Sequence, residues 1–249
     1  MINVILHGSK GRMGSTLEKA ISETSDMNIT AGIDHNIDGS ERYKGFTDIT
    51  ECPLHADVII DFSNHAALHK LLYYAQLHHT PLVLATTAFT SEECKAIKQA
   101  SKKIPIFHSS NMSIGINGIS KILETLVPLL EQEFHIEIIE KHHSKKLDSP
   151  SGTAILLADS INSNCSHKKE YVYGRHGNED YCDINQMGIH SVRGGTIPGE
   201  HSIIFAGPDE IIEIKHTALS RNIFALGALR AARFIVDQNN GLFSMEDLI

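Results

Sequence analysis

The chain has little of what several protein classes require. It contains no tryptophan and only four cysteines in 249 residues. The cysteines form no C-x-x-C pair, which predicts reduced thiols in a cytoplasmic protein and offers no zinc cluster. No stretch approaches the ~20 consecutive apolar residues of a membrane-spanning helix. The first residues also lack the charged-then-apolar pattern of a signal peptide. We therefore expect a cytoplasmic protein without a membrane partner.

Basic residues are outnumbered by acidic ones. The 22 lysines and arginines stand against 30 aspartates and glutamates, for a formal net charge of −8. A protein of this charge is repelled by nucleic acid and by anionic membranes, which argues against both as partners. A small anion is not excluded, because a single site can be locally basic.

Apolar runs of strand length alternate with helical patterns through the first half of the chain. Strands are expected at residues 2–6, 29–33, 58–62, 81–85 and 104–107, with helices over 13–22, over 65–78 and from about 91. Ser91 offers a cap for the last of these helices, ahead of an acidic first turn. Single helices between short buried strands are typical of a parallel sheet with helices on both faces. We expect a Rossmann-type, doubly wound α/β domain.

The second half has a different pattern. Helices are expected over 114–130 and 154–161, and strands over 135–139, 183–192, 201–206 and 211–216, the later strands being joined by Gly/Pro turns. A final helix is expected over 220–237 and returns to the first domain. This pattern predicts a second, α+β domain built on a mixed, largely antiparallel sheet.

A glycine-rich loop joins the first predicted strand to the first helix. Gly8, Gly11 and Gly14 have G-x-x-G-x-x-G spacing, and Asp34 ends the next strand. Such a loop lets the backbone approach a pyrophosphate at a helix start, and a carboxylate at that strand end can bind the ribose. The alternative is an ordinary tight turn with a solvated aspartate. Loop, position and Asp34 together favour a dinucleotide.

The choice between NADH and NADPH stays open on these residues. Asp34 repels a 2′-phosphate and favours NADH, whereas Lys10, Arg12 and His35 lie close in sequence and can offset that charge.

The segment 140–153 carries the strongest chemical pattern. On a strand, His142 and His143 point to opposite sides, which argues against a shared metal. Ser151, Gly152 and Thr153 open a helix, where N–H groups and hydroxyls form a carboxylate site, and Lys146 can add a charge. A bland alternative is a basic solvated loop before a capped helix. The combination favours a reductase that binds an anion and delivers a proton as hydride arrives.

Several ordered motifs resemble one enzyme family. The pattern E-x-H-H-x-x-K-x-D-x-P-S-G-T-A spans residues 140–154, and the G-x-x-G-R-M-G loop, Asp61-Phe-Ser, Thr86-Thr87, Asn111-Met-Ser-x-Gly and Gly199-Glu-His follow the same order. These motifs resemble the 4-hydroxy-tetrahydrodipicolinate reductase (dihydrodipicolinate reductase) family of the diaminopimelate–lysine pathway. The resemblance implies NADH- and/or NADPH-dependent reduction of a cyclic dicarboxylate to tetrahydrodipicolinate with loss of water, in a homotetramer.

The resemblance also implies domain roles and site residues. Residues 1–113 plus 221–249 would bind the dinucleotide, and 114–220 would bind substrate and build the oligomer. His142 and Lys146 match the proton-donating positions. The substrate-binding residues would be His143, Ser151, Gly152, Thr153 and Arg221. The cofactor-binding residues would be Gly8, Ser9, Lys10, Gly11, Arg12, Met13, Asp34, His35, Ala85, Thr86, Thr87, Ser109, Ser110, Asn111 and Met112. No metal is implied.

Two departures from the family pattern bear on the cofactor. Ala85 and Ala88 replace glycines that are frequent in the family, which removes freedom at positive φ, so we expect the loop to sit differently. His35 stands where some members place an arginine for the 2′-phosphate. An amino-acid dehydrogenase on the same scaffold, or a non-catalytic cofactor sensor, would leave the His-His-x-x-Lys pattern unexplained.

Overall fold

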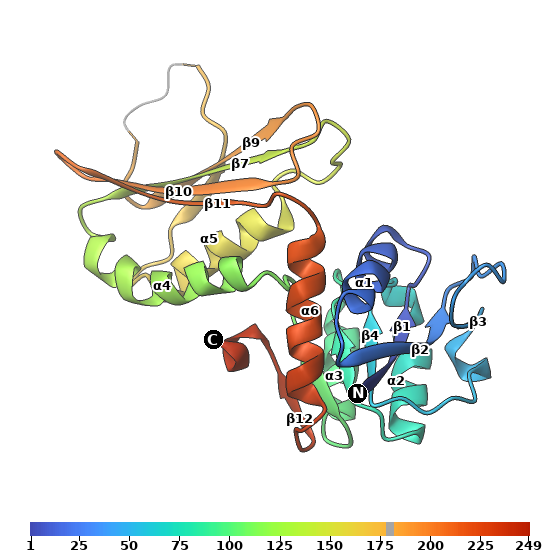
Figure 1. The fold of residues 1–249 in the computed structure, drawn as a ribbon. Helices are drawn as coiled ribbons and strands as arrows, with labels where there is room; N and C mark the ends of the chain where they lie inside the picture. The colour runs from blue at the N-terminus through green and yellow to red at the C-terminus, as the bar shows by residue number, and fades with distance from the viewer. Residues whose placement is uncertain (178–181) are drawn as a thin grey trace. The chain divides into compact units, whose positions relative to one another are not determined.

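The computed structural model describes residues 1–177 and 182–249. The chain forms two compact units, the first made of Met1–Ile114 with Arg221–Ile249 and the second of Gly115–Ser220 (Figure 1). The first boundary lies one residue after the expected one, and the second coincides with it. No helix of the described residues is long and apolar enough to cross a membrane.

A seven-stranded parallel sheet forms the centre of the first unit, with strand order β12-β6-β5-β4-β1-β2-β3. Its strands are β1 (Ile2–His7), β2 (Met27–Ile33), β3 (Lys44–Phe46), β4 (Val58–Asp61), β5 (Leu82–Leu84), β6 (Pro105–His108) and β12 (Gly241–Phe243). All neighbouring pairs are parallel. The expected doubly wound sheet is confirmed. The sequence pattern missed β3 and β12, because each has only three residues, one of them a glycine, and neither lies in an apolar run of strand length.

Helices cover both faces of this sheet. They are α1 (Arg12–Ser22), α2 (Leu68–Leu77), α3 (Ser91–Ala100) and α6 (Asn222–Ile235), with short 3₁₀ turns η1 (Ile49–Glu51), η2 (His65–Ala67) and η3 (Met245–Leu248). Helices α1 and α6 share one buried cluster with the sheet, and α2 and α3 share the other. Helix α3 is capped by Thr90 and not by Ser91, because Thr90 and Glu93 form a reciprocal capping box.

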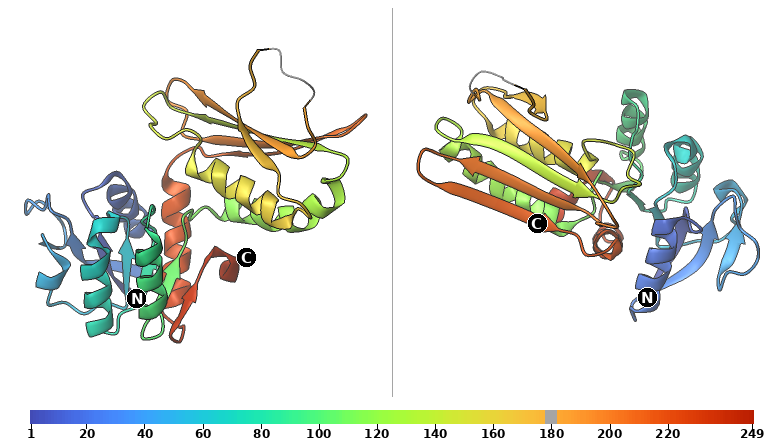
Figure 2. Two further views of the ribbon diagram at one scale, coloured as in Figure 1. Left: turned by 180° about the vertical axis from the view of Figure 1, so that it is seen from behind. Right: turned by 90° about the horizontal axis from the view of Figure 1, so that it is seen from above.

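The second unit is a five-stranded mixed sheet with two helices on one face (Figure 2). Its strands are β7 (His135–His142), β8 (Glu170–Tyr173), β9 (Gln186–Arg193), β10 (Glu200–Ala206) and β11 (Ile211–Thr217), and its helices are α4 (Ile114–Leu130) and α5 (Gly152–Asn164). Strand order is β11-β10-β7-β9-β8. The β10 pairs are antiparallel and the β9 pairs parallel, so the expected mixed sheet is confirmed.

Strand β7 alternates strictly between buried and half-buried residues along its whole length. Ile136 and Ile138 enter the core with α5, and the same alternation buries Glu140 and His142. The strand therefore runs three residues beyond the expected end at 139. This extension puts a carboxylate and an imidazole on the core-facing side at the strand's carboxyl end.

Candidate functional site

The glycine loop after β1 is shaped by close backbone contacts. Gly8 has φ +82°, and a Cβ there would lie 2.5 Å from the carbonyl oxygen of Phe62. A Cβ on Gly14 would lie 2.3 Å from the oxygen of Gly8. Helix α1 begins beyond this turn with no side-chain cap and no acidic residue in its first turn. Its free N–H groups and positive dipole end therefore suit a pyrophosphate.

Asp34 lies directly after β2 and ties the glycine loop to its neighbour. Its carboxylate accepts hydrogen bonds from the backbone N–H of Lys10 at 3.0 Å and of Asn36 at 3.0 Å. The Asp34 side chain is 8% exposed and that of His35 is 87% exposed. Asp34 thus lies beside the loop, as the dinucleotide interpretation requires.

Lys10 is neutralised by two carboxylates that the sequence pattern did not single out. Its Nζ lies 2.7 Å from Glu41 Oε1 and 3.3 Å from Asp38 Oδ1. The side-chain hydrogen bond to Glu41 raises the pKa of Lys10 most, followed by the effects of Asp38. The carboxylates of Asp34, Asp38 and Glu41 therefore lie at this end of the loop, and the Lys10 ammonium is paired with two of them.

The segments after β5 and β6 lie side by side, because these two strands are paired. Ala85 and Thr86 are buried after β5, and within the described part of the chain the Thr86 hydroxyl has no hydrogen-bond partner. Thr87 is exposed. Ala88 has φ +64°, so it keeps the left-handed conformation that glycine would favour, and the expected change there is not seen in φ.

The β6 segment is held by its own polar groups. Ser109 donates to the carbonyl of Asn111 at 2.9 Å, and Ser113 N–H donates to Asn111 Oδ1 at 2.8 Å. Ser110 is exposed and Met112 is buried. Arg12 is exposed, while Ser9 is buried and Met13 half-buried. The expected cofactor residues thus follow the carboxyl ends of β1, β2, β5 and β6, where doubly wound sheets bind nucleotides.

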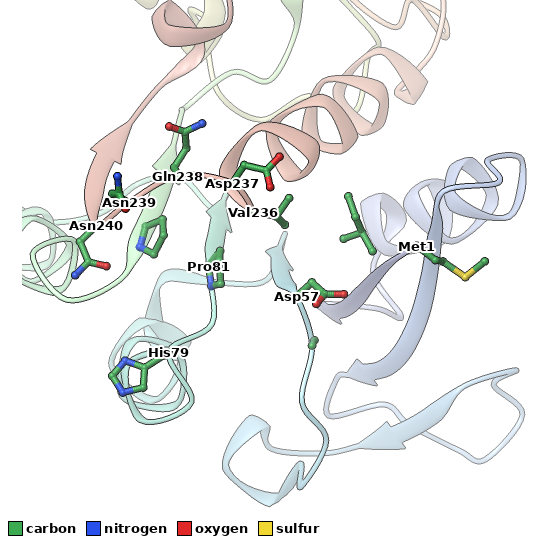
Figure 3. Close-up of a pocket in the computed structure, with 12 residues that line it drawn as sticks. Met1, Asp57, His79, Pro81, Val236, Asp237, Gln238, Asn239 and Asn240 are labelled. Carbon is green, nitrogen blue, oxygen red and sulfur yellow. The ribbon is translucent and has the colours of Figure 1, made fainter.

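A hollow of about 840 Å³ lies at the amino ends of the strands of the same sheet, opposite the glycine loop (Figure 3). Its lining residues precede the strands: Met1, Asp57, Pro81 and Asn240 stand before or at the starts of β1, β4, β5 and β12. It is therefore separate from the glycine loop, and no pattern in the sequence pointed to it.

Glu140 is the centre of the polar cluster in the second unit. It is fully buried, and its Oε2 lies 2.6 Å from His142 Nδ1. Arg193 donates to both carboxylate oxygens at 2.7 Å, and the Ser151 N–H donates to Oε1 at 3.1 Å. Burial acts to raise the pKa of Glu140, but hydrogen bonds from Arg193, Ser191 and His142 outweigh it and lower the pKa to about 2.

Glu140 contacts Nδ1 of the His142 ring, and the other ring nitrogen, Nε2, faces Gly199. A Cβ on Gly199 would lie 3.0 Å from His142 Nε2, so any side chain at this position would crowd that nitrogen. Burial lowers the pKa of His142, against the opposing effect of Glu140. His143 lies just past the strand end and is half-buried, so the adjacent rings occupy different environments.

The start of helix α5 is fixed from within the protein. Ser151 Oγ accepts the Ala154 N–H at 3.1 Å and pairs with His201 Nε2 at 2.8 Å. The Ser151 hydroxyl is thus engaged by the protein. Gly152 is exposed, and an added Cβ would meet no atom within 4 Å. Open space therefore lies in front of the helix start, where Thr153 is half-buried.

Lys146 lies in the turn between β7 and α5. Its Nζ is 2.8 Å from Asp148 Oδ1, and its own N–H donates to the carbonyl of His143 at 3.1 Å. The Lys146 side chain is 20% exposed, and its charge is among the groups that lower the pKa of His142. The expected acid pair, His142 and Lys146, is therefore brought together beside α5.

Arg221 is the one expected substrate residue outside the second unit. It is exposed at the N-cap of α6 in the first unit.

Two members of the polar cluster had no role assigned from sequence. Arg193 and His201 contact Glu140 and Ser151 from β9 and β10. His201 belongs to the Gly199-Glu-His motif, which is the only signal that pointed to it, and nothing in the sequence marked Arg193. Within residues 1–177 and 182–249, no group of three or more His, Cys, Asp or Glu side chains is arranged to hold a metal ion.

Both units of the chain are similar to known proteins. The family model described as dihydrodipicolinate reductase, N-terminus, matches residues 2–112, and the C-terminus model matches residues 115–249. Two proteins named 4-hydroxy-tetrahydrodipicolinate reductase, from Caldanaerobacter subterraneus subsp. tengcongensis and Clostridium novyi, are each 47% identical over 100% of this chain and 98% of their own length.

A solved structure has the same fold across its full length. It is a dipicolinate-bound dihydrodipicolinate reductase from Paenisporosarcina sp. TG-14, with a TM-score of 0.83 at 23% identity and 100% coverage of both chains. The family expected from the motifs is thereby confirmed, together with the oxidoreductase class. The chain belongs to the dihydrodipicolinate reductase family.

Proposed function

We propose that this protein reduces 4-hydroxy-tetrahydrodipicolinate to tetrahydrodipicolinate, consuming one hydride from NAD(P)H and one proton and releasing one water. The observation that carries the proposal is that the buried carboxylate of Glu140 contacts both His142 and the Ser151 N–H at the start of α5, with Lys146 in the turn that joins them. A substrate with two carboxylates needs both cations and N–H donors, and this segment contains them in Lys146 and in the first turn of α5.

The first unit fits the nucleotide. A Cβ at Gly8 or Gly14 would fill the space against the loop backbone, and the Thr86 hydroxyl is buried with no partner among the described residues, ready for a polar ligand atom. The reduced nicotinamide supplies the hydride when bound. Asp34 would accept hydrogen bonds from the ribose hydroxyls. Because Lys10 is already paired with Glu41 and Asp38, we propose NADH as the preferred cofactor.

The second unit would bind the substrate. The N–H groups of Gly152 and Thr153 and the ammonium of Lys146 hold one carboxylate at the α5 start, with His143 as a further contact. Ser151 then acts by fixing the helix start, since its hydroxyl caps α5. Dipicolinate, a planar dicarboxylate, is the ligand named for the Paenisporosarcina structure.

The two candidate acids receive different roles. Burial lowers the pKa of His142, so its ring is largely neutral near pH 7 in the ligand-free protein. We assign proton delivery to the ammonium of Lys146. Glu140 holds the Nδ1–H of His142, which leaves Nε2 to accept a hydrogen bond from the substrate hydroxyl.

A coupled assay with freshly made synthase product tests this function by the absorbance of the reduced cofactor. Lys146→Ala should lower kcat by roughly 10²–10⁴-fold, the usual contribution of a positioned acid, and His142→Ala should lie in the same range. Near-wild-type turnover of both variants contradicts the assigned roles. Absence of turnover in the wild-type protein, with NADH binding intact, would favour a cofactor sensor.

A homotetramer and a cytoplasmic location complete the proposal. Both rest on the family. Among the described residues, β8 and β11 are the edge strands of the second sheet, and an edge strand can pair with another subunit. All four cysteines, Cys52, Cys94, Cys165 and Cys182, are free thiols, which suits a reducing compartment. Sedimentation as a stable monomer would contradict the tetramer.

A further inference from the structure

Asp148 holds a position that an incoming substrate carboxylate needs. Its Oδ1 lies 2.8 Å from Lys146 Nζ, and the nearby Gly152 N–H at the start of α5 helps to lower the pKa of its carboxylate. These are a cation and an N–H group of the anion site proposed above. An internal carboxylate therefore occupies the cation of that site.

The backbone of Asp148 is anchored while its side chain is free to turn. Arg193 Nη2 donates to the Asp148 carbonyl at 2.8 Å, and the same guanidinium is fixed on Glu140. The Asp148 side chain is 58% exposed, so rotation carries it into water and costs it little burial. The exchange requires no movement of the main chain.

The charge on Asp148 persists at working pH. Burial acts to raise its pKa, but the hydrogen bond and charge of Lys146 outweigh burial and lower the pKa below its ordinary value. The carboxylate is therefore ionised throughout the neutral range.

We propose that Asp148 is an internal stand-in for the substrate carboxylate, which must be displaced from Lys146 and Gly152 before the dianion binds. The inference rests on the proposed substrate class. Exchanging one carboxylate for another keeps the ammonium and the helix start paired at every stage, so neither is left uncompensated. The exchange also sets a lower limit on the affinity of a useful ligand, because that ligand must outcompete the carboxylate of Asp148.

The test is direct calorimetric titration of the full-length protein with dipicolinate. Asp148→Asn should tighten dipicolinate binding by roughly 3- to 10-fold, the size expected for one partly exposed ion pair plus one helix-terminus contact. Glu23→Gln is the matched control, since it removes the same charge from a surface pair with Lys19 in the first unit. The control should leave the dissociation constant unchanged.

A double-mutant cycle separates competition from simple charge repulsion. In a Lys146→Ala background, Asp148→Asn should give less than half its gain, because the ammonium for which the two carboxylates compete is gone. The stand-in role is overturned if the gain in affinity is undiminished in that background. It is also overturned if Asp148→Asn alone leaves dipicolinate binding unchanged or weakens it. No dipicolinate binding by the wild-type protein overturns the proposed substrate class and the inference with it.

Discussion

Glu140 Oε2 lies 2.6 Å from His142 Nδ1, and the two residues are separated by a single position on β7. A strand brings residues two apart onto one face, so this pair is a direct product of strand geometry. Arg193 and the Ser151 N–H take the remaining positions around the carboxylate. The imidazole is thereby held in one orientation.

Glu140→Gln should lower kcat by roughly 10²-fold, because a neutral amide holds the His142 ring less firmly and the imidazole loses its carboxylate partner. It should also lower the free energy of unfolding by about 3–5 kcal/mol, since the Arg193 charge loses its buried partner. Steady-state kinetics and urea unfolding measure the two effects. Glu137→Gln is a matched control, because Glu137 makes a 2.6 Å contact with His190 from the other face of β7. Unchanged kcat in Glu140→Gln would contradict the orienting role.

The stability of the second unit should fall as pH drops from about 6.5 to 4. Burial, followed by the charge of His142, lowers the pKa of His201 from 6.5 to about 4. The unfolded state therefore binds more protons in this interval, and stability present above pH 6.5 is lost as pH falls through the folded value. The shift corresponds to roughly 3 kcal/mol.

Urea unfolding between pH 4.5 and 8 measures this slope. His201→Gln, which can still bond to Ser151, should flatten it. His167→Gln, at an exposed position, should not. An equal slope in wild type and His201→Gln would show that another group carries the dependence.

Glu41→Gln should raise kcat/KM for NADPH by roughly 10-fold and leave that for NADH within about 2-fold. Removing this charge leaves the Lys10 ammonium with the longer 3.3 Å contact to Asp38 in place of the 2.7 Å contact to Glu41, so it pairs more readily with a 2′-phosphate. Comparing both cofactors in one assay provides the measurement. A wild-type preference of ~100-fold or more for NADPH would contradict the proposed choice of NADH.

Ala88→Gly should stabilise the first unit by about 0.5–1 kcal/mol, because Ala88 sits at φ +64°, where a Cβ is strained. Thermal unfolding should show a rise in Tm of about 2 °C. Ala96→Gly in helix α3 should change stability with the opposite sign, since glycine weakens a helix interior. A lower Tm for Ala88→Gly would mean that the loop relies on the Ala88 methyl.

The amino-acid sequence by itself indicated the longer strands and helices and the glycine loop, and the resemblance of its motifs indicated the family. The elements follow from local periodicity and residue spacing, as for α4, whose bounds at 114 and 130 were predicted to the residue. Elements such as β3 and β12, with three residues that include a glycine, form no apolar run that the sequence could show.

Only the tertiary structure decided which groups neutralise one another. Lys10 looked available for a 2′-phosphate, yet chain folding brings Glu41 to it. Ser151 looked like a ligand-binding hydroxyl, yet it caps α5 and pairs with His201 from β10. Asp148 and Lys146 are two positions apart, but the placement of their ion pair near the start of α5 depends on the path of the turn. Electrostatic and hydrogen-bond partners depend on distances of a few ångströms between segments far apart in sequence, and sequence spacing does not encode those distances.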